Sequence, residues 1–334
     1  MSGVAKKLMQ ATAGAGEPSG NYIAMGNAVT PYFTLLDHTT PGSVSLAATY
    51  TLTVTNGYGT DFTPDGNYIV VGGSATVLTL LDHTTPGSVS LAATYVLTGR
   101  AERPKFSPDG NYIAGSHLSS PFFTLLDHTT PGSVSLAATY TLTGSGLGTS
   151  FSPDGNYIAT AHSNAPYFTL LDHTTPGSVS LAATYTLTRS GLRTAFSPDG
   201  NYIAVGNNLA PYFTLLDHTT PGSVSLAATY TFPGLVNDVN FHPEGDYIAV
   251  AHDNGTGFTL LDHSTPGSVS LSATYTLPGD GEAAAFSPNG KYIAVGHRST
   301  PFFTLLNHTP LGSVSIAATY TASGLGLGVS FSPS

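Results

Sequence analysis

A unit of about 45 residues recurs along the whole chain, and this repeat restricts the possible folds more than any other feature of the sequence. The element Gly-x-Tyr-Ile begins seven times, at Gly20, Gly66, Gly110, Gly155, Gly200, Gly245 and Gly290. Successive copies are 44–46 residues apart. A period of this length with four short strands per unit is typical of β-propeller blades. Helical repeats would instead require apolar residues at a spacing near 3.6, which the sequence lacks.

Each unit divides into four short segments that favour strands. In the unit around Gly155 we expect them at 148–152, 156–160, 167–171 and 179–187. Tyr, Ile, Phe, Thr and Val suit a pleated sheet. The intervening Ser-Pro-Asp-Gly and Thr-Pro-Gly-Ser segments favour turns, because proline presets φ and glycine allows positive φ.

The two ends of the repeat region complement each other. The chain enters its first unit at the second strand, and it ends at 328–334 with a lone first strand. Sharing of strands between the ends of a ring removes exposed sheet edges. The sequence therefore predicts an all-β, seven-bladed propeller over residues 18–334, with four antiparallel strands per blade. The C-terminal strand would complete the first blade, and residues 1–17 would form an N-terminal arm.

Composition excludes several classes of function. The chain has 9 Lys+Arg against 19 Asp+Glu, a formal net charge of -10, which argues against a nucleic-acid partner because phosphate binding needs a basic surface. It has no cysteine, and therefore neither disulfides nor a zinc–thiolate site. No apolar run reaches the length of a membrane span, and residues 1–17 lack the apolar stretch of a secretory signal.

The copies differ from one another mainly in two connections. The segment Leu-Leu-Asp-His-Thr-Thr-Pro-Gly-Ser-Val-Ser-Leu-Ala-Ala-Thr-Tyr is unchanged in five units, whereas the links between units and the links between second and third strands vary. Because strands of a blade alternate in direction, both variable links lie on one face, here named the loop face. The near-constant turns lie on the opposite face, here named the turn face.

Varied loops on a rigid scaffold commonly carry binding groups. Arginine also suits the planar recognition of carboxylates, including those of acidic sugars. We therefore predict a binding surface on the loop face, and the alternative is a set of solvated loops that have drifted apart. The predicted binding residues are Arg100, Arg103, Lys105, Arg189, Arg193, Asn237, Asp238, His252, Asp253 and Arg298.

Three recurring patterns resemble metal sites, and each favours a structural role. The two residues of each Asp-His pair, for example Asp172 and His173, point to opposite faces of a strand and cannot converge on one ligand. The histidines that begin the varied loops, such as His162, would be too far apart around the ring to share a zinc ion. The aspartate of Ser-Pro-Asp-Gly supplies one carboxylate per turn, too few for calcium. We predict neither a metal nor a cofactor.

The segment Phe-Ser-Pro-Asp-Gly-Asn-Tyr-Ile-Ala at 151–159 resembles the WD40-like propeller repeat. Counterparts begin at Phe106, Phe196, Phe241 and Phe286. The segment at 161–169, Ala-His-Ser-Asn-Ala-Pro-Tyr-Phe-Thr, resembles propeller repeats encoded by tailed bacteriophages and their prophages. The chain has no Trp, so the Trp-Asp ending of eukaryotic WD40 repeats is absent.

The phage resemblance implies a virion structural protein, in a tail or capsid appendage, without enzymatic activity. It would bind other virion proteins or a host-surface glycan through the loop face. The expected location is the virion, or the cytoplasm if the gene is not from a phage. One alternative is a bacterial scaffold or interaction propeller. Another is a lactonase-type hydrolase, which we disfavour because the expected inner-strand positions are mostly small residues, with Asp61 and His242 as exceptions.

Overall fold

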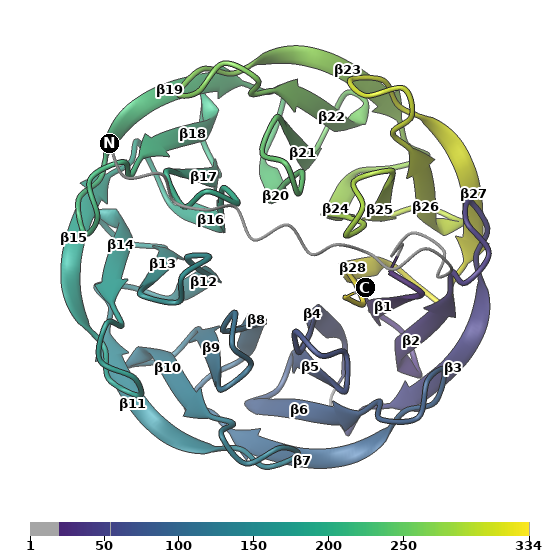
Figure 1. Cartoon of the computed structure of the whole chain (residues 1–334), viewed down its shortest axis with the longest axis horizontal. Helices are drawn as coiled ribbons and strands as arrows, with labels where there is room; N and C mark the ends of the chain where they lie inside the picture. Colours follow the sequence, from purple (N-terminus) through teal and green to yellow (C-terminus); the bar gives the residue numbers. More distant parts are fainter. Residues whose placement is uncertain (1–19, 54, 334) are drawn as a thin grey trace, which may run out of the picture.

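The computed structural model describes residues 20–53 and 55–333. Over these residues the chain forms seven four-stranded antiparallel sheets arranged as blades around a central axis (Figure 1). No helix that could span a membrane occurs in this part of the chain. The seven-bladed propeller predicted from the repeat is confirmed, and the arm predicted for residues 1–17 lies outside the described residues.

The inner and second strands of the blades lie nearest the axis. The inner strands are β4 (Gly57–Phe62), β8 (Ala101–Phe106), β12 (Gly146–Phe151), β16 (Gly191–Phe196), β20 (Val236–Phe241), β24 (Gly281–Phe286) and β28 (Gly326–Phe331). The second strands are β1 (Tyr22–Asn27), β5 (Tyr68–Gly73), β9 (Tyr112–His117), β13 (Tyr157–His162), β17 (Tyr202–Asn207), β21 (Tyr247–His252) and β25 (Tyr292–His297).

The third and outer strands complete the blades. The third strands are β2 (Tyr32–Asp37), β6 (Val77–Asp82), β10 (Phe122–Asp127), β14 (Tyr167–Asp172), β18 (Tyr212–Asp217), β22 (Gly257–Asp262) and β26 (Phe302–Asn307). The outer strands are β3 (Ser45–Thr51), β7 (Ser90–Val96), β11 (Ser135–Thr141), β15 (Ser180–Thr186), β19 (Ser225–Thr231), β23 (Ser270–Thr276) and β27 (Ser315–Thr321).

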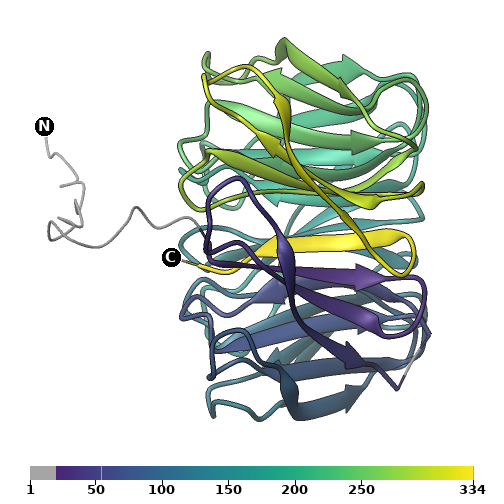
Figure 2. The same ribbon diagram turned by 90° about the vertical axis from the view of Figure 1, so that its right-hand side faces the viewer.

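The ring closes by pairing the two ends of the described chain. The first blade has the order β28-β1-β2-β3, so its inner strand comes from the C-terminal end. Ile23 lies opposite Phe331, and Met25 lies opposite Val329. In Figure 1 the yellow β28 accordingly lies against the purple β1, and Figure 2 shows the same pairing from the side. The predicted closure is confirmed.

The hydrophobic core lies between neighbouring blades. One cluster joins Phe33 and Leu35 of the first blade to Phe62, Ile69 and Leu81 of the second. Equivalent clusters recur around the ring, and the phenylalanine at the position of Phe33 is fully buried in six blades. Each blade therefore buries its two faces only by contact with both neighbours, so that the ring is one cooperative unit.

The turn face is built from the near-constant residues. The carboxylate of Asp154 accepts hydrogen bonds from Ser152 Oγ (2.5 Å) and the Asn156 amide (3.0 Å), and Gly155 has a φ of 76°. His173 Nδ1 hydrogen-bonds the carbonyl of Gly155 at 2.8 Å, which ties the turn of the third and outer strands to the turn of the inner and second strands. These aspartates and histidines therefore stabilise turns, as the sequence predicts.

The histidines that end the second strands are also structural. His162 is fully buried, and its Nε2 lies 3.0 Å from Thr169 Oγ1 on the third strand. His297 forms the same contact with Thr304 at 3.0 Å. In another blade Asn207 takes the histidine's place and donates to Thr214 Oγ1, also at 3.0 Å. The position thus requires a buried polar group that joins the second strand to the third.

We expect the C-terminal strand to contribute as much to stability as an internal one. Phe331 of β28 and Phe151 of β12 occupy equivalent places, and both are 9% exposed. Phe331→Ala and Phe151→Ala should each lower the free energy of unfolding by about 3–5 kcal/mol, measured in urea. A negligible effect at Phe331 beside a full effect at Phe151 would show that the ring is not closed by β28.

Acid should destabilise the propeller before its carboxylates are protonated. Burial lowers the pKa of His162 and of His297 to about 4, against an ordinary value of 6.5. Between about pH 6.5 and pH 4 the unfolded chain therefore binds protons that the folded chain does not, and stability falls as the pH falls. Each unit of difference corresponds to about 1.4 kcal/mol.

The matched variant is His162→Asn/His297→Asn, since asparagine serves at this position in other blades. Thermal unfolding across pH 7 to 4 should show a smaller loss of stability in the double variant than in the parent chain. Identical pH profiles would contradict this origin of the acid sensitivity.

Candidate functional site

The inner strands enclose a cavity of about 390 Å³ at the propeller axis. Its wall contains residues from all seven inner strands, and also Pro64, Ser107 and Pro108 from the turns that follow them. The first two residues of each inner strand do not contribute to the wall. Because inner strands run from the loop face to the turn face, the cavity occupies the half of the channel nearer the turn face.

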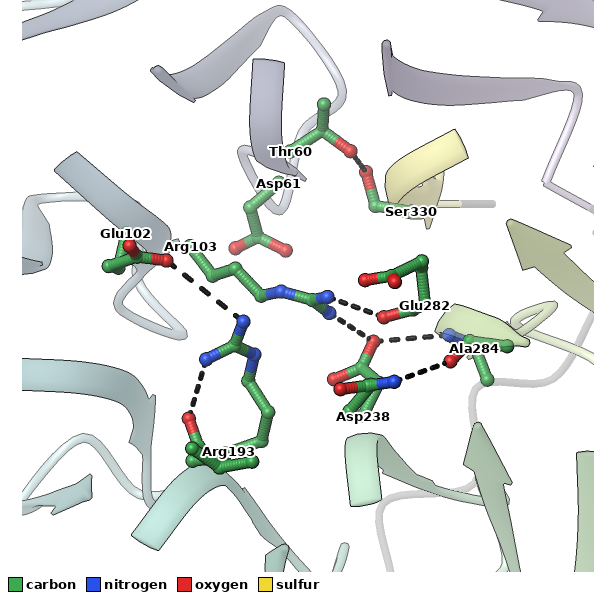
Figure 3. A network of polar contacts seen from close by, with 12 residues as sticks. Thr60, Asp61, Glu102, Arg103, Arg193, Asp238, Glu282, Ala284 and Ser330 are labelled. Carbon is green, nitrogen blue, oxygen red and sulfur yellow. Dashed lines mark hydrogen bonds and ion pairs between the residues drawn. The ribbon is translucent and has the colours of Figure 1, made fainter. Parts of the chain in front are cut away.

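Arg103 crosses the channel near the end of this cavity that faces the loops. Its guanidinium forms an ion pair with Asp238 (Nη1–Oδ2, 2.7 Å) and donates from Nη2 to the carbonyl of Glu282 (2.5 Å). Arg103 comes from β8, whereas its partners come from β20 and β24 on the other side of the axis (Figures 1 and 3). The side chain is 9% exposed, so this cross-channel ion pair is largely withdrawn from water.

Asp238 is further fixed by the neighbouring blade. Its Oδ2 accepts a hydrogen bond from the backbone amide of Ala284 at 3.1 Å. The inner strands have no sheet partner on the side of the axis, and this contact satisfies one of their unpaired amides. Asp61 does the same for the amide of Phe106 (2.9 Å), and its other oxygen forms an ion pair with Lys105 at 3.0 Å.

Arg193 of β16 is the second guanidinium of the cavity. Its Nη1 donates to the carbonyls of Leu147 (2.5 Å) and Leu192 (2.7 Å), and its Nη2 lies 4.0 Å from Glu102 Oε2 (Figure 3). Burial, and to a smaller degree the charge of Arg103, lower the pKa of Arg193 to about 10. The group therefore remains a cation at neutral pH.

Glycines in the preceding blades make room for the two arginines. A Cβ on Gly59 would lie 2.6 Å from Arg103 Cα, and one on Gly148 would lie 2.8 Å from Arg193 Cα. Both distances are shorter than a carbon–carbon contact allows. The inner strands that carry the arginines therefore approach the preceding blade closely at a glycine.

A second group of charges lies on the loop side of the cavity. Arg298 forms an ion pair with Glu282 and lies within 3.6 Å of Asp280 and 3.8 Å of Asp253. Asn237 donates to Asp253 Oδ1 at 2.6 Å. Arg100 pairs with Glu102 and lies over the ring of Tyr58. These contacts cross-link the ends of the inner strands nearest the loop face.

The predicted binding residues separate into three groups. Arg103, Lys105, Arg193 and Asp238 lie in the wall of the axial cavity. Arg100, Asn237, Asp253 and Arg298 belong to the ion-pair cluster on its loop side. Arg189 is exposed and away from both, and His252 is buried with its Nε2 2.9 Å from Thr259 Oγ1. The structure therefore does not place the ten residues on one exposed surface.

The placement of the charged residues in loops was wrong for Arg103, Lys105, Arg193 and Asp238. We expected the inner strands to begin at the position of Gly148, but they begin two residues earlier, at the position of Gly146. The four residues nevertheless lie at or after the expected start, because Arg103, Arg193 and Asp238 stand at the position of Gly148 and Lys105 stands two residues further. We assigned them to the variable link because the copies differ at these positions. Counting back from the phenylalanine that precedes each turn would have placed these side chains in the channel.

The predicted binding residues also omitted three carboxylates, and the histidine expected at an inner-strand position does not line the cavity. Asp61 pairs with a cation of the cavity wall, and Glu102 and Glu282 pair with cations of the loop-side cluster, although none of the three was among the predicted binding residues. His242 lies outside the cavity wall, edge-on to Phe286 with ring centroids 5.1 Å apart. Within residues 20–53 and 55–333, no three His, Asp or Glu side chains are grouped so as to hold a metal ion.

Sequence comparison gives a local match to a known repeat. The family described as WD domain, G-beta repeat matches residues 226–256, which run from the outer strand of one blade through the first two strands of the next. Comparison with curated proteins gives no match. Together with the seven blades, the repeat match supports a WD40-like propeller.

Solved structures share the architecture at low identity. A provisionally assigned 6-phosphogluconolactonase from Bacteroides uniformis has a TM-score of 0.81 at 14% identity, over 93% of this chain and 98% of that one. The periplasmic gluconolactonase of Pseudomonas aeruginosa has 0.77 at 14%, over 94% and 97%. The propeller domain of Cps50 (Swd1) from Myceliophteria thermophila has 0.70 at 12%, over 86% and 92%. At such identities the similarity establishes the fold alone.

These comparisons contradict the prediction of a non-enzymatic phage virion module. Of the three structures described above, two carry the names of lactonases and none is named as a virion protein. We disfavoured hydrolysis because the expected inner-strand positions were mostly small residues. That reason fails as well, because five charged side chains line the cavity: Asp61, Arg103, Lys105, Arg193 and Asp238.

We expect the cross-channel ion pair to be essential for stability. Arg103→Met keeps most of the side-chain volume but leaves the Asp238 carboxylate without its cation. The free energy of unfolding in urea should fall by about 3–5 kcal/mol. The matched control Arg189→Met, at an exposed site, should change it by less than about 0.5 kcal/mol. Equal effects of the two substitutions would contradict the role assigned to Arg103.

Proposed function

We propose that the protein is a hydrolase that opens the ester ring of a small lactone inside the axial cavity. The observation that carries this proposal is a cavity of about 390 Å³ whose wall combines two carboxylates with three cations. A volume of this size falls within the range of small-molecule sites, roughly 300–1,000 Å³. The lactonase names of two structural neighbours agree with this choice of reaction class.

Lactone hydrolysis needs two groups from the protein. Water adds to the carbonyl carbon while a base accepts one of its protons, and a donor or cation stabilises the negative charge that develops on the carbonyl oxygen. The ring C–O bond then breaks, and the leaving oxygen takes up a proton. The product is the open hydroxy acid, so that one lactone and one water give one product without any redox change.

Asp238 is our candidate for the base. Its Oδ2 is held by Arg103 and by the amide of Ala284, which fixes the orientation of the carboxylate. Among the described residues its Oδ1 has no hydrogen-bond partner, which leaves this oxygen available for a water molecule at the cavity wall. A base with one oxygen anchored and the other open is the arrangement that water activation requires.

The cations of the wall supply the charge stabilisation. Lys105 Nζ is held by a single ion pair with Asp61 and has further donor capacity. Hydroxyl groups of Thr60, Ser150 and Ser330 lie in the same wall. Thr60 and Ser330 bond each other, and Ser150 donates to Thr194. The remaining lone pairs of these hydroxyls can accept hydrogen bonds from the hydroxyls of a sugar-derived lactone. The substrate class that we propose is therefore a hydroxylated lactone of about the size of a hexose.

Asp238→Asn tests this assignment with a side chain of nearly the same shape. D-Glucono-1,5-lactone is a suitable neutral substrate, and acid release can be followed with a pH indicator. We expect the substitution to lower the rate above the spontaneous reaction by about 10²–10⁴-fold. The control Asp280→Asn removes a carboxylate from the loop-side cluster, outside the cavity wall, and should leave the rate within about twofold.

Thermal unfolding of both variants separates loss of chemistry from loss of fold. A parent chain that opens lactones no faster than buffer would overturn the proposed function. Equal rates for the parent chain and Asp238→Asn would overturn the role of this residue. The similarity of the varied segment at 161–169 to phage-encoded repeats stays a prediction about the origin of the gene, and it does not bear on this test.

A further inference from the structure

The axial cavity is positively charged although the whole chain is acidic. The charged residues in its wall are Arg103, Lys105 and Arg193 against Asp61 and Asp238, which gives three positive and two negative charges, a net charge of +1. The chain as a whole has a formal net charge of -10. The wall itself therefore favours an anion over a cation, in contrast to the acidic chain as a whole.

The excess charge belongs to Arg193. Asp238 is paired with Arg103 and Asp61 with Lys105, at 2.7 Å and 3.0 Å. The nearest carboxylate to Arg193, that of Glu102, is 4.0 Å away and is already paired with Arg100. Close partners of Arg193 are the carbonyl groups of Leu147 and Leu192, which are neutral dipoles. Arg193 therefore shares its nearest carboxylate with Arg100 and, among the residues that the structure describes, has no carboxylate within hydrogen-bonding distance.

Both guanidinium groups also have unused hydrogen-bonding capacity. The Nε atoms of Arg103 and Arg193 are buried and have no hydrogen-bond partner. Both residues lie in the cavity wall. The side chain of Arg103 is 9% exposed, and that of Arg193 is 17% exposed. Because the Nε atoms are buried, their missing partners are a cost to the fold. A ligand in the cavity can reach only the exposed part of each guanidinium.

We propose that Arg193, supported by Arg103, binds the anionic group of a small ligand in the axial cavity, and that this group is a carboxylate or a phosphate. The inference rests on the proposed function only in using the same cavity, and it names the class of ligand: a hydroxylated compound with one oxyanion. Arg193 acts here as a binding and specificity residue. The fork of a guanidinium matches the oxygens of either oxyanion.

Titration calorimetry with non-reacting probes tests this site. The probes are D-gluconate for the carboxylate, glucose 6-phosphate and inorganic phosphate for the phosphate, and D-glucose as the neutral control. We expect at least one anion to bind more tightly than D-glucose, and to bind more weakly as salt is added. In Arg193→Gln the Kd of that anion should rise at least tenfold, whereas Arg189→Gln should leave it unchanged.

Arg193→Lys keeps the charge but loses the fork, and its Kd should lie between those of the parent chain and Arg193→Gln. This variant also serves if Arg193→Gln fails to fold, which circular dichroism would detect. A preference for gluconate identifies the carboxylate, and a preference for the phosphates identifies the phosphate. Absence of anion binding at millimolar concentration, or equal losses in the Arg189 and Arg193 variants, would overturn the site.

Failure of this inference can be told apart from failure of the proposed function. If anions bind in an Arg193-dependent way but no lactone is hydrolysed, the anion site stands and the proposed hydrolase function falls. If the neutral lactone is hydrolysed in an Asp238-dependent way but no anion binds through Arg193, the hydrolase function stands and the anion site falls.

Discussion

The inner edge of each blade determines what this protein can do. Every sheet ends at the axis with a strand that pairs on one side only, so a ring of backbone amides and carbonyls faces the channel. Such groups require partners when they are buried. Asp61, Asp238 and Asn240 provide them by accepting amides of the following blade, at 2.9 Å, 3.1 Å and 2.9 Å. The polar side chains of the channel therefore stabilise the ring and also shape its cavity.

An asymmetric ligand site in a repeat protein requires that the repeats differ where they face one another, which here is at the inner strands. The outer and third strands are nearly identical from blade to blade, whereas the third residue of the inner strand is Gly in three blades, Arg in two, Asp in one and Ala in one. The arginines of β8 and β16 each follow a blade with glycine at this position, where the two inner strands approach closely. Charge and space are thus distributed together, and the resulting cavity has no sevenfold symmetry.

The repeat was sufficient to predict the blades, their strands and the closure of the ring, because period, turn residues and strand propensity all agree. The site could not be predicted in the same way. Its residues lie where the copies differ, and a bulge near the start of each inner strand shifts the alternation by one residue. Arg103 and Arg193 stand at the first position of the expected strand, but we assigned them to a loop because the copies differ there. The ion pair of Arg103 with Asp238 joins blades on opposite sides of the axis. No local sequence pattern can indicate a contact between residues so far apart in the chain.

We propose that the cavity on the turn side of the channel is the ligand site of this propeller. A crystal structure of the protein soaked with D-gluconate tests it most directly. We predict one gluconate within the axial cavity, with its carboxylate against Arg193 and Arg103 and its hydroxyls toward Asp238 and the serine and threonine side chains of the wall. Gluconate bound only at the loop face would contradict this assignment. So would an axial cavity that contains only water at saturating gluconate.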